Sequence, residues 1–138
     1  MKKLVTLCFC LSILSFTSCE DILECVINRR PELPDISLEE GYLQQIYNQQ
    51  FDAGIKNEPR DNNYDYYFEL VGDLPDGLDM YIDFRTVIFE GIPLNRGVFE
   101  FTLYLDVDPP VYYDEETGDY EDAMCSYSTS ENYTIIIN

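Results

Sequence analysis

The sequence contains no histidine and no tryptophan, and its basic residues are scarce. Its 138 residues include 8 Lys and Arg against 27 Asp and Glu, which gives a formal net charge of −19. Because histidine is the commonest general base and metal ligand, its absence disfavours catalysis and metal binding. Because phosphate binding needs a basic face, the charge balance argues against a nucleic-acid partner. We therefore expect a protein that is not an enzyme and does not bind nucleic acid.

The chain is nonetheless rich in apolar and aromatic residues. Hydrophobic residues make up 46% of the sequence and aromatic residues 14%. This content is too high for a disordered acidic tail, and the length suits a single folded domain.

Residues 1–18 have the composition of a secretory signal peptide. Lys2 and Lys3 form a short basic start, and residues 4–16 form an apolar run. This run is shorter than the roughly 20 residues that a membrane-spanning helix needs. A basic start, a short apolar stretch and small residues at its end are typical of export signals.

Residues 16–19, Phe-Thr-Ser-Cys, resemble a bacterial lipobox, in which small residues precede a cysteine that becomes lipidated. Phe16 departs from the leucine usual in such motifs. The resemblance implies lipid on Cys19 and acyl chains that anchor the protein. The acidic pair at 20–21 resembles the tag that sends some lipoproteins to the outer face of the outer membrane. We expect a lipid-anchored outer-membrane protein, with either face of the outer membrane open and the acidic pair pointing to the cell surface. Its mature chain has six basic residues against 27 acidic ones, a charge of −21.

Two cysteines remain for the folded domain. Cys8 and Cys10 leave with the signal peptide and Cys19 takes the lipid, so Cys25 and Cys125 form one pair. An exported protein meets oxidising conditions, which predicts a disulfide, with two free thiols as the alternative. Closing so long a loop would stabilise the fold by about 4–5 kcal/mol in the chain-entropy model.

The rest of the chain has the pattern of an all-β protein. Residues 19–36 are predicted to be the lipidated N-terminus and a tether, because Pro31 and Pro34 disfavour helix and central strand. Beyond them, apolar and polar residues alternate with a period of two. Strands are predicted over residues 47–55, 64–71, 78–83, 86–90, 99–107 and 132–138. Short strands divided by glycine and proline turns predict one antiparallel β-sandwich over residues 37–138, with 111–131 mostly loop.

Three motifs carry a family resemblance. They are LPDGL at 74–78, IFEGIP at 88–93 and GVFEFTL at 97–103. Their order resembles the pattern LPxGL, IxGTP and GxY/FxFxV of small Ig-like, cadherin-like domains of bacterial surface proteins. Ile92 replaces the usual threonine, and residues 81–85 replace a small Thr-Gly turn. The resemblance implies an Ig-like sandwich over about 42–138 that serves as a spacer or recognition module.

These motifs also predict which residues shape the turns between strands. Proline fixes φ and glycine permits positive φ, so such turns can reverse the chain tightly, while flanking leucines plug the end of the sandwich. The predicted turn residues are Leu74, Pro75, Gly77, Leu78, Gly91, Pro93 and Gly97.

An acidic, tyrosine-rich segment supplies the candidate site. Its residues are Asp106, Asp108, Tyr112, Tyr113, Asp114, Glu115, Glu116, Asp119, Tyr120, Glu121 and Asp122. Clustered carboxylates can hold Ca²⁺, and tyrosines beside carboxylates can recognise a basic protein. The plain alternative is a solvated loop of like charges. A Cys25–Cys125 disulfide would tie this loop to the tether.

The function expected from the sequence is a lipid-anchored, non-enzymatic binding or structural Ig-like module of the outer membrane. Its partners are the membrane, through the lipid, and either a basic protein or a glycan; no cofactor is expected unless calcium binds the acidic loop. One alternative is an acidic inhibitor or immunity-type lipoprotein that neutralises a basic toxin or hydrolase, since charge steers association. Another is an accessory lipoprotein of a surface glycan-uptake complex.

Overall fold

A computed structural model describes residues 29–110, 112–113, 115, 120–121 and 124–138 of the chain. The described residues form β1 (Arg30–Glu32), β2 (Tyr47–Asp52), β3 (Gly54–Lys56), the 3-10 turn η1 (Asp61–Asn63), β4 (Asp65–Gly72), β5 (Leu78–Asp83), β6 (Thr86–Gly91), β7 (Gly97–Asp108), β8 (Tyr112–Tyr113), β9 (Tyr120–Glu121) and β10 (Ser128–Ile137). In this part of the chain, no helix has the length and apolarity needed to cross a membrane.

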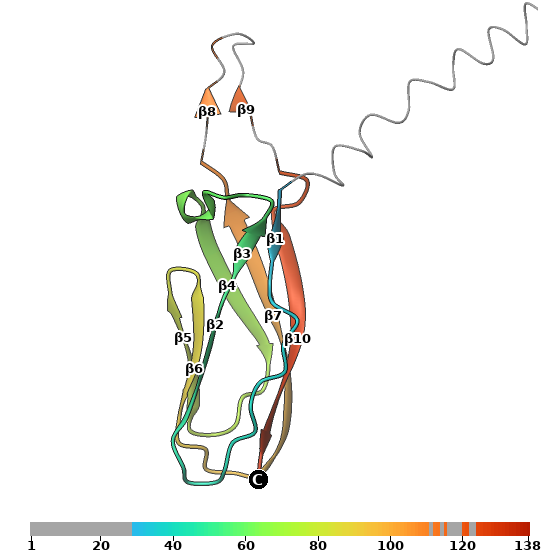
Figure 1. The fold of residues 1–138 in the computed structure, drawn as a ribbon. Coiled ribbons are helices and arrows are strands. Elements are labelled where there is room, and N and C mark those ends of the chain that lie inside the picture. The colour runs from blue at the N-terminus through green and yellow to red at the C-terminus, as the bar shows by residue number, and fades with distance from the viewer. Residues whose placement is uncertain (1–28, 111, 114, 116–119, 122–123) are drawn as a thin grey trace, which may run out of the picture.

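Two antiparallel three-stranded sheets face each other and form a β-sandwich (Figure 1). Their strand orders are β10–β7–β4 and β2–β6–β5. The immunoglobulin sandwich has strands C, F and G in one sheet and strands B, E and D in the other. When β2, β4, β5, β6, β7 and β10 are lettered B to G in chain order, the two sheets of this protein contain the same strands. The paired strands β8 and β9 project from one end, here called the arm end, and the chain finishes at the opposite, far end.

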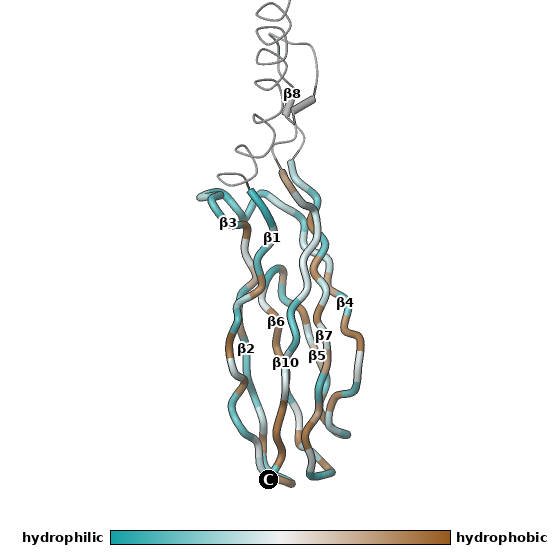
Figure 2. The backbone as a smooth tube through the Cα atoms, turned by 90° about the vertical axis from the view of Figure 1, so that its right-hand side faces the viewer, coloured by the Kyte–Doolittle hydropathy of each residue, from teal (hydrophilic) through white to brown (hydrophobic). Residues whose placement is uncertain are grey.

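The predicted strands are found, except that the strand expected over 47–55 is two strands in different sheets. β2 ends at Asp52 and pairs with β6, whereas β3 begins at Gly54 and pairs with β1. Alternation decides which side chains enter the core. Figure 2 shows hydrophilic and hydrophobic residues alternating along the strands. On β7, Phe101, Leu103, Leu105 and Val107 are buried while the residues between them are half-buried or exposed. β10 begins at Ser128, four residues before the predicted strand, because its backbone pairs with β7 as far as Asp106.

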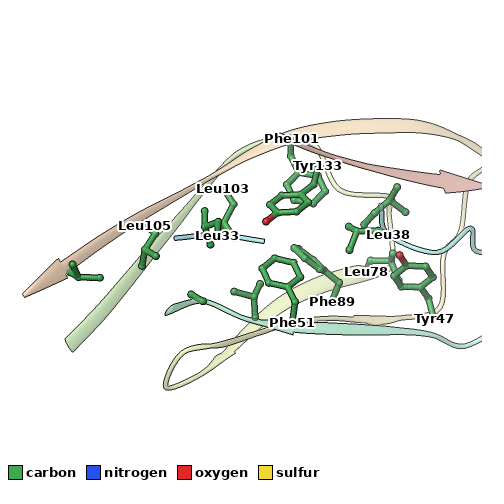
Figure 3. Packing of buried hydrophobic residues seen from close by; sticks show 14 of the residues in the cluster. Leu33, Leu38, Tyr47, Phe51, Leu78, Phe89, Phe101, Leu103, Leu105 and Tyr133 are labelled. Atoms are coloured by element: carbon green, nitrogen blue, oxygen red, sulfur yellow. The ribbon is translucent and has the colours of Figure 1, made fainter. Parts of the chain in front are cut away.

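Aromatic rings join the two sheets across the core (Figure 3). Phe51 of β2 stacks on Tyr133 of β10 with ring centroids 5.0 Å apart. Phe89 of β6 meets Phe101 of β7 at 5.1 Å. Such pairs add about 0.5–1.5 kcal/mol beyond the apolar area that they bury, so these contacts hold one sheet against the other.

The chain joins the sandwich earlier than the sequence predicts. Part of the expected tether is strand β1, which pairs with β3, and Leu33 and Leu38 behind it are buried. Pro31 fits because β1 is a short edge strand that pairs with β3 alone, where a missing N–H is tolerated. Further along the chain, Gly41 pairs in parallel with Ile137 of β10, which belongs to the β10–β7–β4 sheet. The tether prediction for residues 29–36 was therefore wrong.

Two buried tyrosines fasten this N-terminal segment. The Tyr133 hydroxyl donates a hydrogen bond of 2.8 Å to the carbonyl of Pro34, and the Tyr47 hydroxyl donates one of 3.0 Å to the carbonyl of Glu39. Burial, followed by the nearby Glu39 carboxylate, raises the pKa of Tyr47 to about 12. Burial likewise raises the pKa of Tyr133, so both phenols stay protonated donors at neutral pH.

Two of the predicted turns have a geometry that requires glycine. Gly77 has φ 87° and Gly91 has φ 147°, and a Cβ on Gly91 would lie 2.0 Å from the Gly77 carbonyl oxygen. Leu78 is buried, and Leu74 packs against the core. Among the remaining turn residues, Pro75 and Pro93 are fully buried, and Gly97 has φ 156°.

The turn that departs from the family pattern is stabilised by its own contacts. Phe84 takes φ 56°, a conformation that favours glycine. Its ring packs edge-on against Tyr66 at 5.4 Å, and the neighbouring Arg85 forms an ion pair with Asp61. The β5–β6 hairpin is therefore held against the segment that leads into β4.

Replacing Tyr133 by Phe is expected to lower the free energy of unfolding by about 1 kcal/mol, because the Pro34 carbonyl loses its donor. Exposed Tyr67→Phe is the control and should change it by less than about 0.5 kcal/mol. Unfolding in urea, followed by circular dichroism, measures both. Equal effects of the two substitutions would contradict the role given to Tyr133.

Tyrosines with raised pKa values also predict how stability depends on pH. The folded pKa values of Tyr47 and Tyr66 are raised from 10.0 to about 12, so the unfolded chain releases these protons first. Stability should therefore be constant with respect to these groups below about pH 9 and fall between about pH 10 and 12. The Tyr133→Phe variant should show a shallower fall.

Candidate interaction surface

The outer faces of both sheets are acidic and carry no cation. None of the six strands in the two sheets contains a lysine or an arginine. Alternation directs nine carboxylates outward, and all nine are exposed: Asp65, Glu69, Glu100, Asp106 and Asp108 on one face, and Asp52, Asp79, Asp83 and Glu90 on the other. Charges of one sign on both faces create a field that attracts basic molecules.

The basic residues lie at or beside the arm end instead. Of the six lysines and arginines in the described part of the chain, five belong to this region: Arg29, Arg30, Lys56, Arg60 and Arg85. Several of them hold the local structure together. Arg29 Nε lies 2.9 Å from Glu58 Oε2, and Arg85 pairs with Asp61. These pairs leave the sheet faces without compensating charge.

Exposed tyrosines stand among the carboxylates on both faces. On the β10–β7–β4 sheet, Tyr67 lies opposite Asp106, and Tyr104 lies opposite Glu69. Tyr67 is 54% exposed and Tyr104 is 42% exposed. On the other sheet, Tyr81 is 50% exposed. Tyrosine offers a large, rigid contact area at a low cost in side-chain entropy, so these rings suit recognition.

The acidic segment predicted as one loop is divided between two structures. Asp106 and Asp108 belong to β7 and lie on the outer face of its sheet. Beyond them, β8 pairs with β9 and Glu115 is exposed between them. The paired residues are Tyr112 with Glu121 and Tyr113 with Tyr120. The other predicted members lie outside the described residues: Asp114, Glu116, Asp119 and Asp122.

The sequence prediction missed the β4 residues that share this face. Asp65 lies opposite Asp108, and Tyr67 lies opposite Asp106. The signal was present in the alternation, because these residues alternate with Tyr64, which is buried, and with Tyr66, which packs against the core. What the sequence could not supply was the register that brings the two strands together. Within the described residues, no three Asp, Glu or Cys side chains are grouped so that they could hold a metal ion.

The predicted lipid and disulfide positions are only partly within the described chain. Cys19 and Cys25 lie outside the described residues. The backbone N–H of Cys125 donates a 3.1 Å hydrogen bond to the Arg29 carbonyl, beside a parallel bridge between Arg29 and Met124. The segment around Cys125 therefore lies against the first described residues of the chain.

Carboxylates face each other directly on both sheets. Asp79 pairs across strands with Glu90, and Asp65 pairs with Asp108. Like charges directly opposite on one sheet face are destabilising, typically by a fraction of a kcal/mol. No cation within the six strands offsets either pair, so the repulsion between the paired carboxylates lowers the stability of the fold.

No family model matches the chain, and no curated protein matches it. Among solved structures, it is similar to an endo-fucoidan hydrolase of glycoside hydrolase family 107, with 18% identity and a TM-score of 0.47 over 74% of this chain and 12% of that one. It is also similar to a proposed alpha-galactosidase from Bacteroides fragilis NCTC 9343, with 19% identity and a TM-score of 0.42 over 80% of this chain and 18% of that one. The chain thus spans less than a fifth of either protein.

Replacing Asp79 by Asn is expected to raise the free energy of unfolding by about 0.2–1 kcal/mol, because it removes one charge of the pair with Glu90. The matched control is Asp73→Asn, which removes the same charge from an exposed loop residue. Urea unfolding at low and high salt measures both variants, and salt should shrink the gain. No greater gain at Asp79 than at Asp73 would refute the repulsion.

Proposed function

We propose that the protein is a lipid-anchored, non-enzymatic binding module of the outer membrane whose acidic faces recognise a basic protein partner. The observation that supports this most is the separation of charge. Cations gather in ion pairs near the arm end, while both faces present carboxylates and tyrosines without any lysine or arginine in their strands. Complementary charge speeds association and selects partners. An inhibitor of a basic toxin or hydrolase would use the same surface.

The position of the chain's first described residue supports the anchoring part of the proposal. Strand β1 begins at the arm end (Figure 1), and Arg29, which directly precedes it, follows Cys19 by ten residues. Ten extended residues reach at most about 35 Å. A lipid on Cys19 would therefore keep the arm end near the membrane, while the sheet faces extend away from it toward a partner.

A disulfide between Cys25 and Cys125 fits this arrangement. Cys125 hydrogen-bonds to Arg29, which follows Cys25 by four residues, so the two sequence positions approach the same end. The link would tie the segment after β9 to the N-terminal segment, and both would then remain near the membrane.

Two experiments test the cysteine assignments. Cys19→Ala should move the protein from the membrane fraction to the soluble fraction, because the acyl chains supply the anchoring free energy. Before reduction, a thiol reagent should label neither Cys25 nor Cys125 in the mature chain. Retention of the variant in membranes would refute the anchor, and labelling without reductant would refute the disulfide.

The binding function can be tested before a natural partner is identified. The mature chain is used to select from a phage-displayed heptapeptide library. Selected peptides should be enriched in lysine and arginine, and their affinity should fall several-fold when NaCl is raised to about 0.5 M, which screens exposed charge. Binders without this enrichment, or the absence of any binder, would contradict a module for basic partners.

A further inference from the structure

The outer face of the β2–β6–β5 sheet carries a hollow where β2 and β5 begin and β6 ends. The hollow has a volume of about 270 Å³. The residues that line it include Ile46, Asn48, Asp79, Tyr81, Glu90 and Ile92. Pockets for small-molecule ligands are usually about 300–1,000 Å³, so this hollow suits a smaller object such as one side chain.

One part of the lining is apolar and unusually exposed. Ile46 is 84% exposed, Tyr81 is 50% exposed and Ile92 is 48% exposed. Three such side chains around one hollow form a small apolar patch on an otherwise acidic surface. They offer a surface for an aliphatic chain, and the tyrosine ring adds a face that attracts cations.

The other part of the lining is negative. Asp79 and Glu90 lie directly opposite each other on β5 and β6. The Asn48 amide donates a 3.3 Å hydrogen bond to Glu90 Oε2 from the neighbouring strand. The two carboxylates repel each other, and the strands that carry them contain no lysine or arginine. A cation brought by a partner would relieve this repulsion.

The backbone holds the apolar walls in place. The Ile92 N–H donates a 3.0 Å bond to the Gly77 carbonyl, and the Gln44 N–H donates a 3.0 Å bond to the Pro93 carbonyl. The second bond ties the loop that leads to Ile46 to the turn that follows Ile92. A site that is already formed loses less entropy when it binds.

We propose that this hollow receives a lysine or arginine side chain of a protein partner. The aliphatic stem would lie against Ile46, Ile92 and Tyr81, and the charged head would meet Asp79 and Glu90. Long basic side chains divide naturally in this way, because their stems are apolar and their heads are charged. A neutral sugar would leave the carboxylate pair uncompensated, so charge complementarity favours the basic side chain.

This inference rests on the proposed function and identifies where on the acidic surface binding occurs. The test uses two double variants of the mature chain and the peptides selected from the heptapeptide library. Asp79→Asn with Glu90→Gln removes the charges of the hollow. Asp65→Asn with Asp108→Asn removes two charges from the opposed pair on the other sheet and serves as the matched control. Both variants are expected to fold, because each loses a repulsive pair.

Fluorescence anisotropy measures the affinity of each variant for the selected peptides. The hollow variant should lose at least about tenfold in affinity, which corresponds to about 1.4 kcal/mol. The Asp65/Asp108 variant should lose less affinity than the hollow variant, because it removes the same charge without changing the hollow. Equal losses in both variants would show general electrostatic attraction and overturn the assignment of the hollow.

Other outcomes separate the two proposals. Loss only in the control variant would leave the binding module intact and move its site to the β10–β7–β4 face. A glycan array could show saturable binding to the native chain that the hollow variant lacks. The ligand of the hollow would then be a sugar and not a basic side chain. Failure of the library to yield any binder would overturn both the hollow and the binding function.

Discussion

This structure depends on one constraint, which is the strict alternation of inward and outward side chains along strands that contain no lysine or arginine. Each strand must bury every second side chain between the sheets, so the intervening residues must face solvent. On β7 this places Leu105 and Val107 in the core and Asp106 and Asp108 outside. Because the strands contain no lysine or arginine, folding itself creates two faces of one charge. The fold therefore places the carboxylates on two faces, and the repulsion between them lowers the free energy of unfolding.

The N-terminal segment completes the sandwich that bears these faces. It pairs with β3 through β1, buries Leu33, and then pairs with β10 at Gly41. The hydroxyl of Tyr133 reaches Pro34 across 99 positions of sequence. This bond links the last strand to the segment that directly follows the first strand, so the two ends of the described chain are stabilised together.

Much of the architecture could be predicted because it depends on local sequence patterns. Alternation predicted the strands, and glycine and proline predicted turns such as that at Gly91. The tether prediction failed because it weighed the local preference of Pro31 and could not include burial of Leu33 by distant residues. The hollow was unpredictable for a similar reason, since it needs the register of Asp79 with Glu90 and a loop that places Ile46 beside them.

The central claim is that an acidic hollow at Tyr81 contacts a basic side chain of a protein. The most direct measurement places a photo-reactive phenylalanine analogue at Tyr81 in cells that express the full chain, with the same analogue at Tyr67 on the other face as a comparison. Mass spectrometry then identifies the cross-linked molecule. The account predicts a protein cross-linked at position 81 next to a lysine or arginine. Cross-links to protein only at position 67, or only to glycan at position 81, would contradict it.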